Sequence, residues 1–315
     1  MIEDELSTRY KYERANESDI HFHITNACLD SCKYCYMGGI SPYSPERVDM
    51  PLETFISIVE TIRPKERKRI GNSNDRDVLL SGGDPLIHPN LSEIVTYLKN
   101  NDYFVSIMSS GLPLVKGDTE IWEIISMLDE NDKVSINNNE IHSITDEQVN
   151  SIRQHYEEKS LDFSLEFNPL MPTDIVPTKR AMEYWSYFKF GENFLSYPGT
   201  YDHTNAVSPF PKNSSFNSCR QSNNFGQIIT NPKGEFLYCV FQQDDQVCHI
   251  DDLKGMERDD ALHYIAEKIH KKRDKILDEY YSKYYGNHFN CFDHITGSIL
   301  DDINPHDFVE EDIQV

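Results

Sequence analysis

The chain has 315 residues, with 53 Asp and Glu against 30 Lys and Arg, so its formal net charge at pH 7 is -23. This charge repels polyphosphate backbones and argues against DNA or RNA as a partner. No apolar run is long enough to cross a bilayer, and an odd number of cysteines without an apolar signal segment argues against a secreted disulfide framework. We therefore expect a cytoplasmic protein with one large α/β domain and a smaller appended unit.

A strand-then-helix rhythm runs from Asp19 to about Pro172 and is typical of parallel βαβ units. The expected strands are Asp19–Thr25, Asp77–Ser81, Tyr103–Ser109, Lys133–Asn138 and Asp162–Asn168. The helices expected between them are Leu52–Ile62, Leu91–Lys99, Glu120–Leu128 and Glu147–Glu158. These elements predict an α/β fold built on a parallel sheet.

Several of these strands alternate apolar and polar residues, although parallel strands covered on both faces are usually apolar throughout. In the last strand the alternating polar residues are Ser164, Glu166 and Asn168, and in the first they include His21 and His23. We infer a partly polar interior in which Glu166, Asn168 and the two histidines are candidates for substrate contacts, with Glu166 the catalytic candidate. A solvated sheet face and histidines paired within the core are the alternatives that the sequence leaves open.

Past Pro172 the rhythm gives way to a loop-rich stretch. A β-hairpin is expected at Gly226–Thr230 and Glu235–Val240, around a turn with Pro at its second place and Gly at its end. A long amphipathic helix is expected from Arg258 to Tyr285.

Three cysteines lie directly after the first strand, as a C-x3-C-x2-C run of Cys28, Cys32 and Cys35. Three thiolates on one loop can hold three corners of a cubic iron-sulfur cluster and leave the fourth iron open to another ligand. A structural zinc site needs four closed ligands, commonly as C-x2-C pairs, so this spacing suits zinc poorly. Zinc and inert buried thiols stay open as alternatives.

This run resembles the radical S-adenosylmethionine (SAM) superfamily, in which it follows the first strand of a partial (β/α)6 TIM-like barrel and an aromatic residue precedes the last cysteine. The resemblance implies a 4Fe-4S cluster on the three cysteines, with bound SAM and the ring of Tyr34 near its adenine. It also implies an enzyme that cleaves SAM reductively to a 5'-deoxyadenosyl radical and removes hydrogen from a substrate C-H bond. A one-electron donor such as flavodoxin or ferredoxin would be its partner.

A second match follows the second strand, where Gly82, Gly83, Asp84 and Pro85 resemble the family's Gly-Gly-Glu-Pro segment, which meets the methionine amino group. Two glycines let backbone carbonyls approach an ammonium closely, and the acid adds complementary charge. The departure is Asp84 in place of Glu, one methylene shorter. Weaker resemblances assign contacts with the ribose or the methionine carboxylate to Ser109, Ser135 and Asn137.

The remaining cysteines include a C-x14-G-x4-C run of Cys219, Gly234 and Cys239, which resembles the start of the SPASM and twitch extensions with their auxiliary iron-sulfur cluster. Two ligand sets are open. One is Cys219, Cys239, Cys248 and Cys291, and the other replaces Cys248 with His294 or an open iron. The second set frees Cys248 to donate a hydrogen atom to a substrate radical. A zinc site and scattered buried cysteines are the alternatives.

These resemblances divide the chain into an N-terminal segment (1–18), a radical SAM partial barrel (19–190), an auxiliary iron-sulfur extension of a small β-hairpin plus a helix (191–300), and an acidic tail (301–315). The expected substrate is a ribosomally synthesised peptide that is epimerised, crosslinked or oxidised. One alternative is a small-molecule dehydrogenase or epimerase acting on an aminated sugar or cyclitol. Another is a zinc-stabilised binding protein without catalysis.

Overall fold

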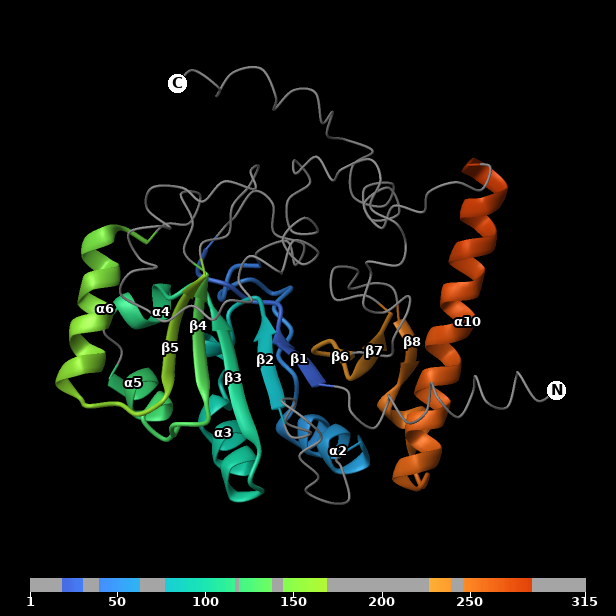
Figure 1. The fold of residues 1–315 in the computed structure, drawn as a ribbon, viewed down its shortest axis with the longest axis horizontal. Coiled ribbons are helices and arrows are strands. Elements are labelled where there is room, and N and C mark those ends of the chain that lie inside the picture. Colours follow the sequence, from blue (N-terminus) through green and yellow to red (C-terminus); the bar gives the residue numbers. More distant parts are fainter. Residues whose placement is uncertain are drawn as a thin grey trace.

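A single mixed sheet forms the centre of the molecule across the residues that the computed structural model describes (Figure 1). These residues are 19–30, 40–62, 77–116, 119–137, 144–168, 227–238 and 246–284. Within them the strand order is β5-β4-β3-β2-β1-β6-β7-β8. The strands are β1 (Asp19–Thr25), β2 (Asp77–Gly82), β3 (Phe104–Ser109), β4 (Lys133–Asn137), β5 (Ser164–Asn168), β6 (Gln227–Thr230), β7 (Glu235–Leu237) and β8 (Gln246–His249).

Strands β1 to β5 pair in parallel with their neighbours, as the βαβ rhythm predicts. Their bounds agree with the predicted ones to within two residues. The α/β class with its parallel sheet is therefore confirmed, and the carboxyl ends of the five strands meet at one edge of the sheet. This edge is where ligands bind in open parallel sheets.

The C-terminal strands extend this sheet on the other side of β1. Strands β6 and β7 form the predicted hairpin, and Gly234 in its turn has a φ of +81°, which glycine adopts at little cost. Two pairings were not predicted: β6 lies parallel to β1, and β8 adds a third strand antiparallel to β7. The hairpin is thus continuous with the main sheet. The predicted boundary between residues 190 and 191 lies outside the described residues.

Helices pack mainly on one side of this sheet, with α2, α3 and α5 along β1 to β4 and α10 beside β8 (Figure 1). The helices are α2 (Leu52–Ile62), α3 (Leu91–Asn100), α4 (Leu112–Val115), α5 (Thr119–Ile125), α6 (Asp146–Glu158) and α10 (Arg258–Tyr284), with short 3-10 turns η1 (Pro85–Ile87) and η4 (Ile250–Leu253). The prediction of a helix to Leu128 was too long. From Met127 the backbone N-H groups bond three residues back rather than four, which ends the α-helix.

The core lies between the helices and the apolar face of the sheet. Cross-strand partners put one row of apolar residues on that face: Phe22, Leu80, Ile107, Val134 and Leu165. Phe22 packs on Phe55 of α2 with ring centroids 4.6 Å apart. Each such buried side chain contributes about 2 kcal/mol by leaving water. The predicted alternation is confirmed here, since Phe163, Leu165 and Phe167 are buried.

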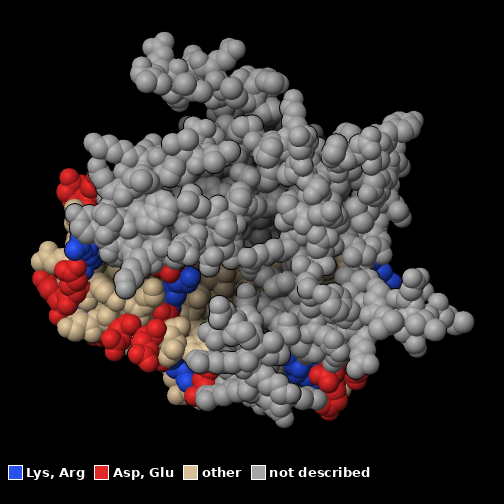
Figure 2. All heavy atoms as spheres, viewed as in Figure 1, with Lys and Arg blue, Asp and Glu red and all other residues tan. Residues whose placement is uncertain are grey.

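None of the helices in the described ranges combines the length and the apolar character that a bilayer crossing requires. Figure 2 shows acidic side chains along the lower left edge of this view, over the helical side of the sheet, with single basic side chains between them. On α6, Arg153 Nε and Glu157 Oε1 are 2.8 Å apart and form an ion pair.

Candidate functional site

The first candidate ligand, Cys28, lies three residues past the end of β1. Its backbone N-H donates to the carbonyl of Ile40 at 2.8 Å, and Ala27 and Ile40 form a bridge, so the cysteine loop begins and ends at the same place. The Sγ atom of Cys28 is half-buried and accepts a hydrogen bond from the N-H of Asp30 at 3.3 Å. A backbone donor aimed at sulfur favours the thiolate, the form that binds iron, so Cys28 fits a cluster ligand.

The other two thiolates and the aromatic residue of this loop are not placed. Cys32, Cys35 and Tyr34 belong to residues 31–39, which lie outside the described residues. Among the described residues, no group of three or more Cys, His, Asp or Glu side chains is able to hold a metal ion.

Gly82 and Gly83 hold the end of β2 against the end of β1. The N-H of Gly83 donates to the carbonyl of Thr25 and the N-H of Asp84 to that of Ala27, both at 2.7 Å. A Cβ added to Gly82 would lie 2.2 Å from the Thr25 oxygen, and one added to Gly83 would lie 2.0 Å from the Ala27 oxygen. The glycines are therefore required by this backbone contact, which brings the turn next to the loop that carries Cys28.

Asp84 joins the turn to the end of β3. Its fully buried carboxylate accepts hydrogen bonds from Ser109 Oγ at 2.9 Å, from the N-H and Oγ of Ser110, and from the N-H of Leu86. Burial raises the pKa of Asp84, although the hydrogen bonds from the two serines oppose that shift. Pro85 follows as the first residue of η1, which the Asp84 carboxylate caps.

This arrangement changes the interpretation of two predicted cofactor contacts. The Asp84 carboxylate is directed at β3, and the Ser109 hydroxyl donates to it while accepting from the N-H of Gly111 at 2.9 Å. A direct contact of either side chain with SAM would have to replace these bonds. Ser110, which sequence reasoning missed, makes two of the hydrogen bonds to Asp84, and its place in the Ser-Ser-Gly segment was the available signal.

The opposite face of the sheet from Phe22 carries polar side chains, which we call the inner-face cluster: His21, His23, Ser81, Ser135 and Glu166. The register places His23 beside Ser81, and Ser135 beside Glu166. Ser135 Oγ donates to Glu166 Oε2 at 3.4 Å, and Lys133 Nζ lies 3.3 Å from the same oxygen. Lys133 was missed by sequence reasoning, although it is two residues before Ser135 and so on the same face.

The two histidines of the cluster are both buried, and their rings meet edge to face with centroids 4.8 Å apart. His21 Nε2 and Ser81 Oγ share a hydrogen bond of 2.5 Å. Burial, and secondly the neighbouring His23, lowers the pKa of His21 well below its usual value, so the ring is neutral at pH 7. Asn137 and Asn168 end β4 and β5 as register partners, and their side chains lie outside the described set.

Cys248 lies on the other face of the sheet. The register runs from Phe22 to Thr230, then to Phe236 and to Cys248, so the thiol shares the helix-covered face with Phe22. It is buried, and burial raises its pKa to about 12. The thiol faces away from the inner-face cluster, which disfavours hydrogen donation to a substrate held there, while its role as a cluster ligand stays a prediction.

The other predicted ligands of the auxiliary cluster, Cys219, Cys239, Cys291 and His294, lie outside the described residues. Cys239 directly follows the last described residue of the β7 segment, Tyr238. The hairpin turn between β6 and β7 has Gly234 where the C-x14-G-x4-C pattern requires it.

The sequence profile described as the radical SAM superfamily matches residues 22–167. A search of curated proteins gave no match. Among solved structures, the chain is similar to BtrN in complex with AdoMet and 2-DOIA, with 14% identity and a TM-score of 0.49 over 84% of this chain and 89% of that chain. It is also similar to Streptococcus suis SuiB bound to S-adenosylmethionine, with 14% identity and a TM-score of 0.42 over 76% of this chain and 64% of SuiB. SuiB bound to its precursor peptide SuiA gives 12% identity and a TM-score of 0.42 over 83% and 71%. Similarities of this size carry no information about the substrate.

Proposed function

This chain belongs to the radical SAM superfamily through residues 22–167, and we propose that it removes hydrogen from a substrate C-H bond held over the inner-face cluster. Cys28, Cys32 and Cys35 would hold the 4Fe-4S cluster that the family implies. When bound, the cluster and SAM supply the electron and the 5'-deoxyadenosyl radical for this chemistry. Flavodoxin or ferredoxin is the class of electron donor that we propose.

The observation that carries the proposal is the contact between the ends of β1 and β2. Two backbone hydrogen bonds of 2.7 Å, from Gly83 to Thr25 and from Asp84 to Ala27, hold the glycine turn beside the loop of Cys28. Backbone carbonyls of this turn are suited to accept hydrogen bonds from the ammonium group of methionine. A thiolate loop and an ammonium site at one edge of a parallel sheet are the two halves of a SAM site.

The inner-face cluster supplies groups that can orient a substrate. Neutral His21 with Ser81 can both donate and accept hydrogen bonds, and Glu166 with Ser135 can accept from an amine or a hydroxyl. Ser81 on β2 and Ser135 on β4 are two strands apart, which is about 10 Å. Orientation by these groups would expose one C-H bond to the radical and keep water from it.

Two substrate classes follow from different observations. The hairpin with Gly234 in its turn supports a twitch or SPASM-like extension, and hence modification of a ribosomally synthesised peptide by epimerisation, crosslinking or oxidation. The hydroxyl, imidazole and carboxylate groups of the inner-face cluster support an aminated sugar or cyclitol, acted on by a dehydrogenase or an epimerase. For the auxiliary cluster we propose Cys219, Cys239, Cys291 and His294, which leaves the buried Cys248 thiol outside the cluster.

The test is anaerobic purification followed by metal analysis and incubation with SAM and a reductant. About four irons per chain indicate one cubane cluster and about eight indicate two. Release of 5'-deoxyadenosine is expected, and its dependence on added peptide or aminated sugar would identify the substrate class. Zinc alone, without iron or 5'-deoxyadenosine after reconstitution, would show a binding protein instead of an enzyme.

A further inference from the structure

Residues 40–50, which we call the strap, connect the cysteine loop to α2. The strap is paired with the end of β1 at several points. The N-H of Cys28 donates to Ile40 at 2.8 Å, and the N-H of Asn26 donates to Val48 at 3.1 Å. The Asn26 side chain adds two more bonds, accepting from the N-H of Val48 and donating to the carbonyl of Glu46. The strap therefore closes the base of the cysteine loop.

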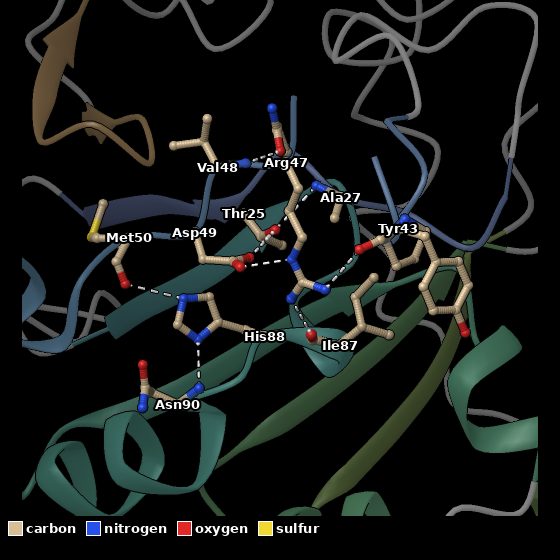
Figure 3. A network of polar contacts seen from close by, with 12 residues as sticks. Thr25, Ala27, Tyr43, Arg47, Val48, Asp49, Met50, Ile87, His88 and Asn90 are labelled. Carbon is tan, nitrogen blue, oxygen red and sulfur yellow. Dashed lines mark hydrogen bonds and ion pairs between the residues drawn. The ribbon is translucent and has the colours of Figure 1, made fainter. Parts of the chain in front are cut away.

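Arg47 extends this contact from the strap to the turn after β2 (Figure 3). Its Nε donates to Asp49 Oδ2 at 2.6 Å, its Nη1 to the carbonyl of Pro42 at 3.2 Å, and its Nη2 to the carbonyl of Ile87 at 2.9 Å. The second carboxylate oxygen of Asp49 accepts from Thr25 Oγ1 at 2.7 Å. One guanidinium thus joins two points of the strap to η1, and through Asp49 to the end of β1.

The geometry of these bonds requires arginine. The guanidinium directs its donors in one plane toward three separate acceptors, whereas a lysine ammonium is a single point that cannot reach all three. The Arg47 side chain is 23% exposed, so its bonds are only partly open to competition from water. Ile87 is the last residue of η1, which begins directly after the Gly82, Gly83 and Asp84 turn.

We propose that Arg47 is a positioning residue for the SAM site, which sets the distance between the cysteine loop and the glycine turn. The turn is held directly by Thr25 and Ala27, and the 3-10 turn η1 that follows it is held by Arg47 through Ile87. The acceptors of Arg47 lie in the strap and in η1, so its effect on the site passes through these two segments. This inference rests on the proposed function, because it requires a cluster and a cofactor to be held at that edge.

The test compares Arg47→Met, Arg47→Lys and the wild type, with Arg153→Met as the matched control. Arg153 also donates to a carboxylate, that of Glu157, but at an exposed site on α6. Four quantities are measured under anaerobic conditions: iron per chain, the melting temperature, the dissociation constant of SAM by calorimetry, and the change that SAM causes in the EPR signal of the reduced cluster.

We expect Arg47→Met to keep its iron and to melt at a lower temperature than Arg153→Met, because it loses three partly buried hydrogen bonds, while the dissociation constant of SAM measured well below the melting temperature rises tenfold or more. Arg47→Lys keeps one of the three bonds, so its dissociation constant for SAM should lie between those of the wild type and Arg47→Met. Unchanged SAM affinity and EPR response in Arg47→Met would overturn the inference. Loss of iron in both Arg47 variants would overturn it too, because Arg47 would then maintain the loop and not the spacing. A wild type that binds neither iron nor SAM would refute the proposed function instead.

Discussion

Ser109 Oγ donates to the carboxylate of Asp84 at 2.9 Å, so a fully buried acid joins the ends of β2 and β3. The family's Gly-Gly-Glu-Pro segment has a longer acid at this place. Here the shorter side chain fits between Ser109, Ser110 and the N-H of Leu86 and has hydrogen-bond donors on both of its oxygens. The difference in length from Glu therefore has a local structural reason.

Substitution of Asp84 should cost stability in a graded way. Asp84→Ala leaves two serine hydroxyls and two N-H groups without their acceptor, which should lower the free energy of unfolding by about 3 kcal/mol. Asp84→Asn keeps one acceptor oxygen and should cost less. Asp84→Glu adds a methylene to a filled site and should cost about 1 to 3 kcal/mol. Urea unfolding measures all three, and an Asp84→Glu variant as stable as the wild type would contradict the proposed fit.

The raised pKa of Asp84 predicts the sign of a pH effect. An acid whose pKa is higher in the folded state binds its proton more tightly there, so it contributes most stability below its unfolded pKa and loses that contribution as pH rises through the folded pKa. The wild type should therefore lose stability relative to Asp84→Asn as pH increases from about 4 toward neutrality. A difference that stays constant across this interval would show that the carboxyl does not titrate with a raised pKa.

Gly83→Ala should reduce stability and iron binding more than a glycine-to-alanine change at an open position does. Its Cβ would lie 2.0 Å from the backbone oxygen of Ala27, so β1 and β2 would have to separate at the site. Gly255→Ala is the control, since nothing lies within 4 Å of its added Cβ and only the φ of +79° opposes it, at a cost of about 1 kcal/mol. We expect Gly83→Ala to lower the melting temperature further and to bind less iron. Equal effects of the two variants would be evidence against the close contact.

Substitution of Cys28 and substitution of Cys248 should have opposite effects on iron content and product release. Cys28→Ala should remove the iron of one cluster, about four atoms per chain, and abolish 5'-deoxyadenosine release. Cys248→Ala should keep iron and product release and lose only about 1 kcal/mol of stability, because it empties a small apolar site. Peptide-level mass spectrometry adds a second readout. With a pKa of about 12, the buried Cys248 thiol should resist alkylation at pH 8 until the protein unfolds. Iron loss in Cys248→Ala would show instead that Cys248 is a ligand of the auxiliary cluster.

Glu166→Gln tests the inner-face cluster. The change removes the charge that pairs with Lys133 Nζ at 3.3 Å and keeps the shape of the side chain. If Glu166 contacts an amine of the substrate, KM should rise about tenfold, while iron content and SAM cleavage without substrate stay unchanged. Glu157→Gln on α6 is the control, because it removes a similar ion pair on the surface. Equal KM values for the two variants would argue against a substrate contact at Glu166.

The sequence was sufficient to predict the features that depend on residues close together in the chain. Alternation in β5 predicted that Phe163, Leu165 and Phe167 face the helices, and the Pro and Gly positions predicted the β6–β7 hairpin. The spacing of Cys28 after β1 placed it at the carboxyl edge of the sheet. These features depend on neighbours within a few residues, which a single sequence displays.

The features that the sequence missed depend on partners far along the chain. Ser109 was expected to contact SAM because its segment resembles one near the cofactor in the family, but its partner here is Asp84, and the β2–β3 pairing brings the two together. The face on which Cys248 lies follows from four strands in register, from β1 to β8. The role of Arg47 could not be predicted from the sequence, because two of its acceptors are the backbone carbonyls of Pro42 and Ile87, and backbone carbonyls leave no pattern in a sequence.

The parallel pairing of β6 with β1 has a consequence for how the molecule assembles. Strand β1, from residues 19–25, obtains its second neighbour from residues 227–230, so this part of the sheet closes only after most of the chain has been synthesised. Contacts between such distant segments slow folding. A polypeptide cut before Gln227 would leave β1 with a bare row of N-H and C=O groups beside the cysteine loop, open to pairing with another molecule and hence to aggregation.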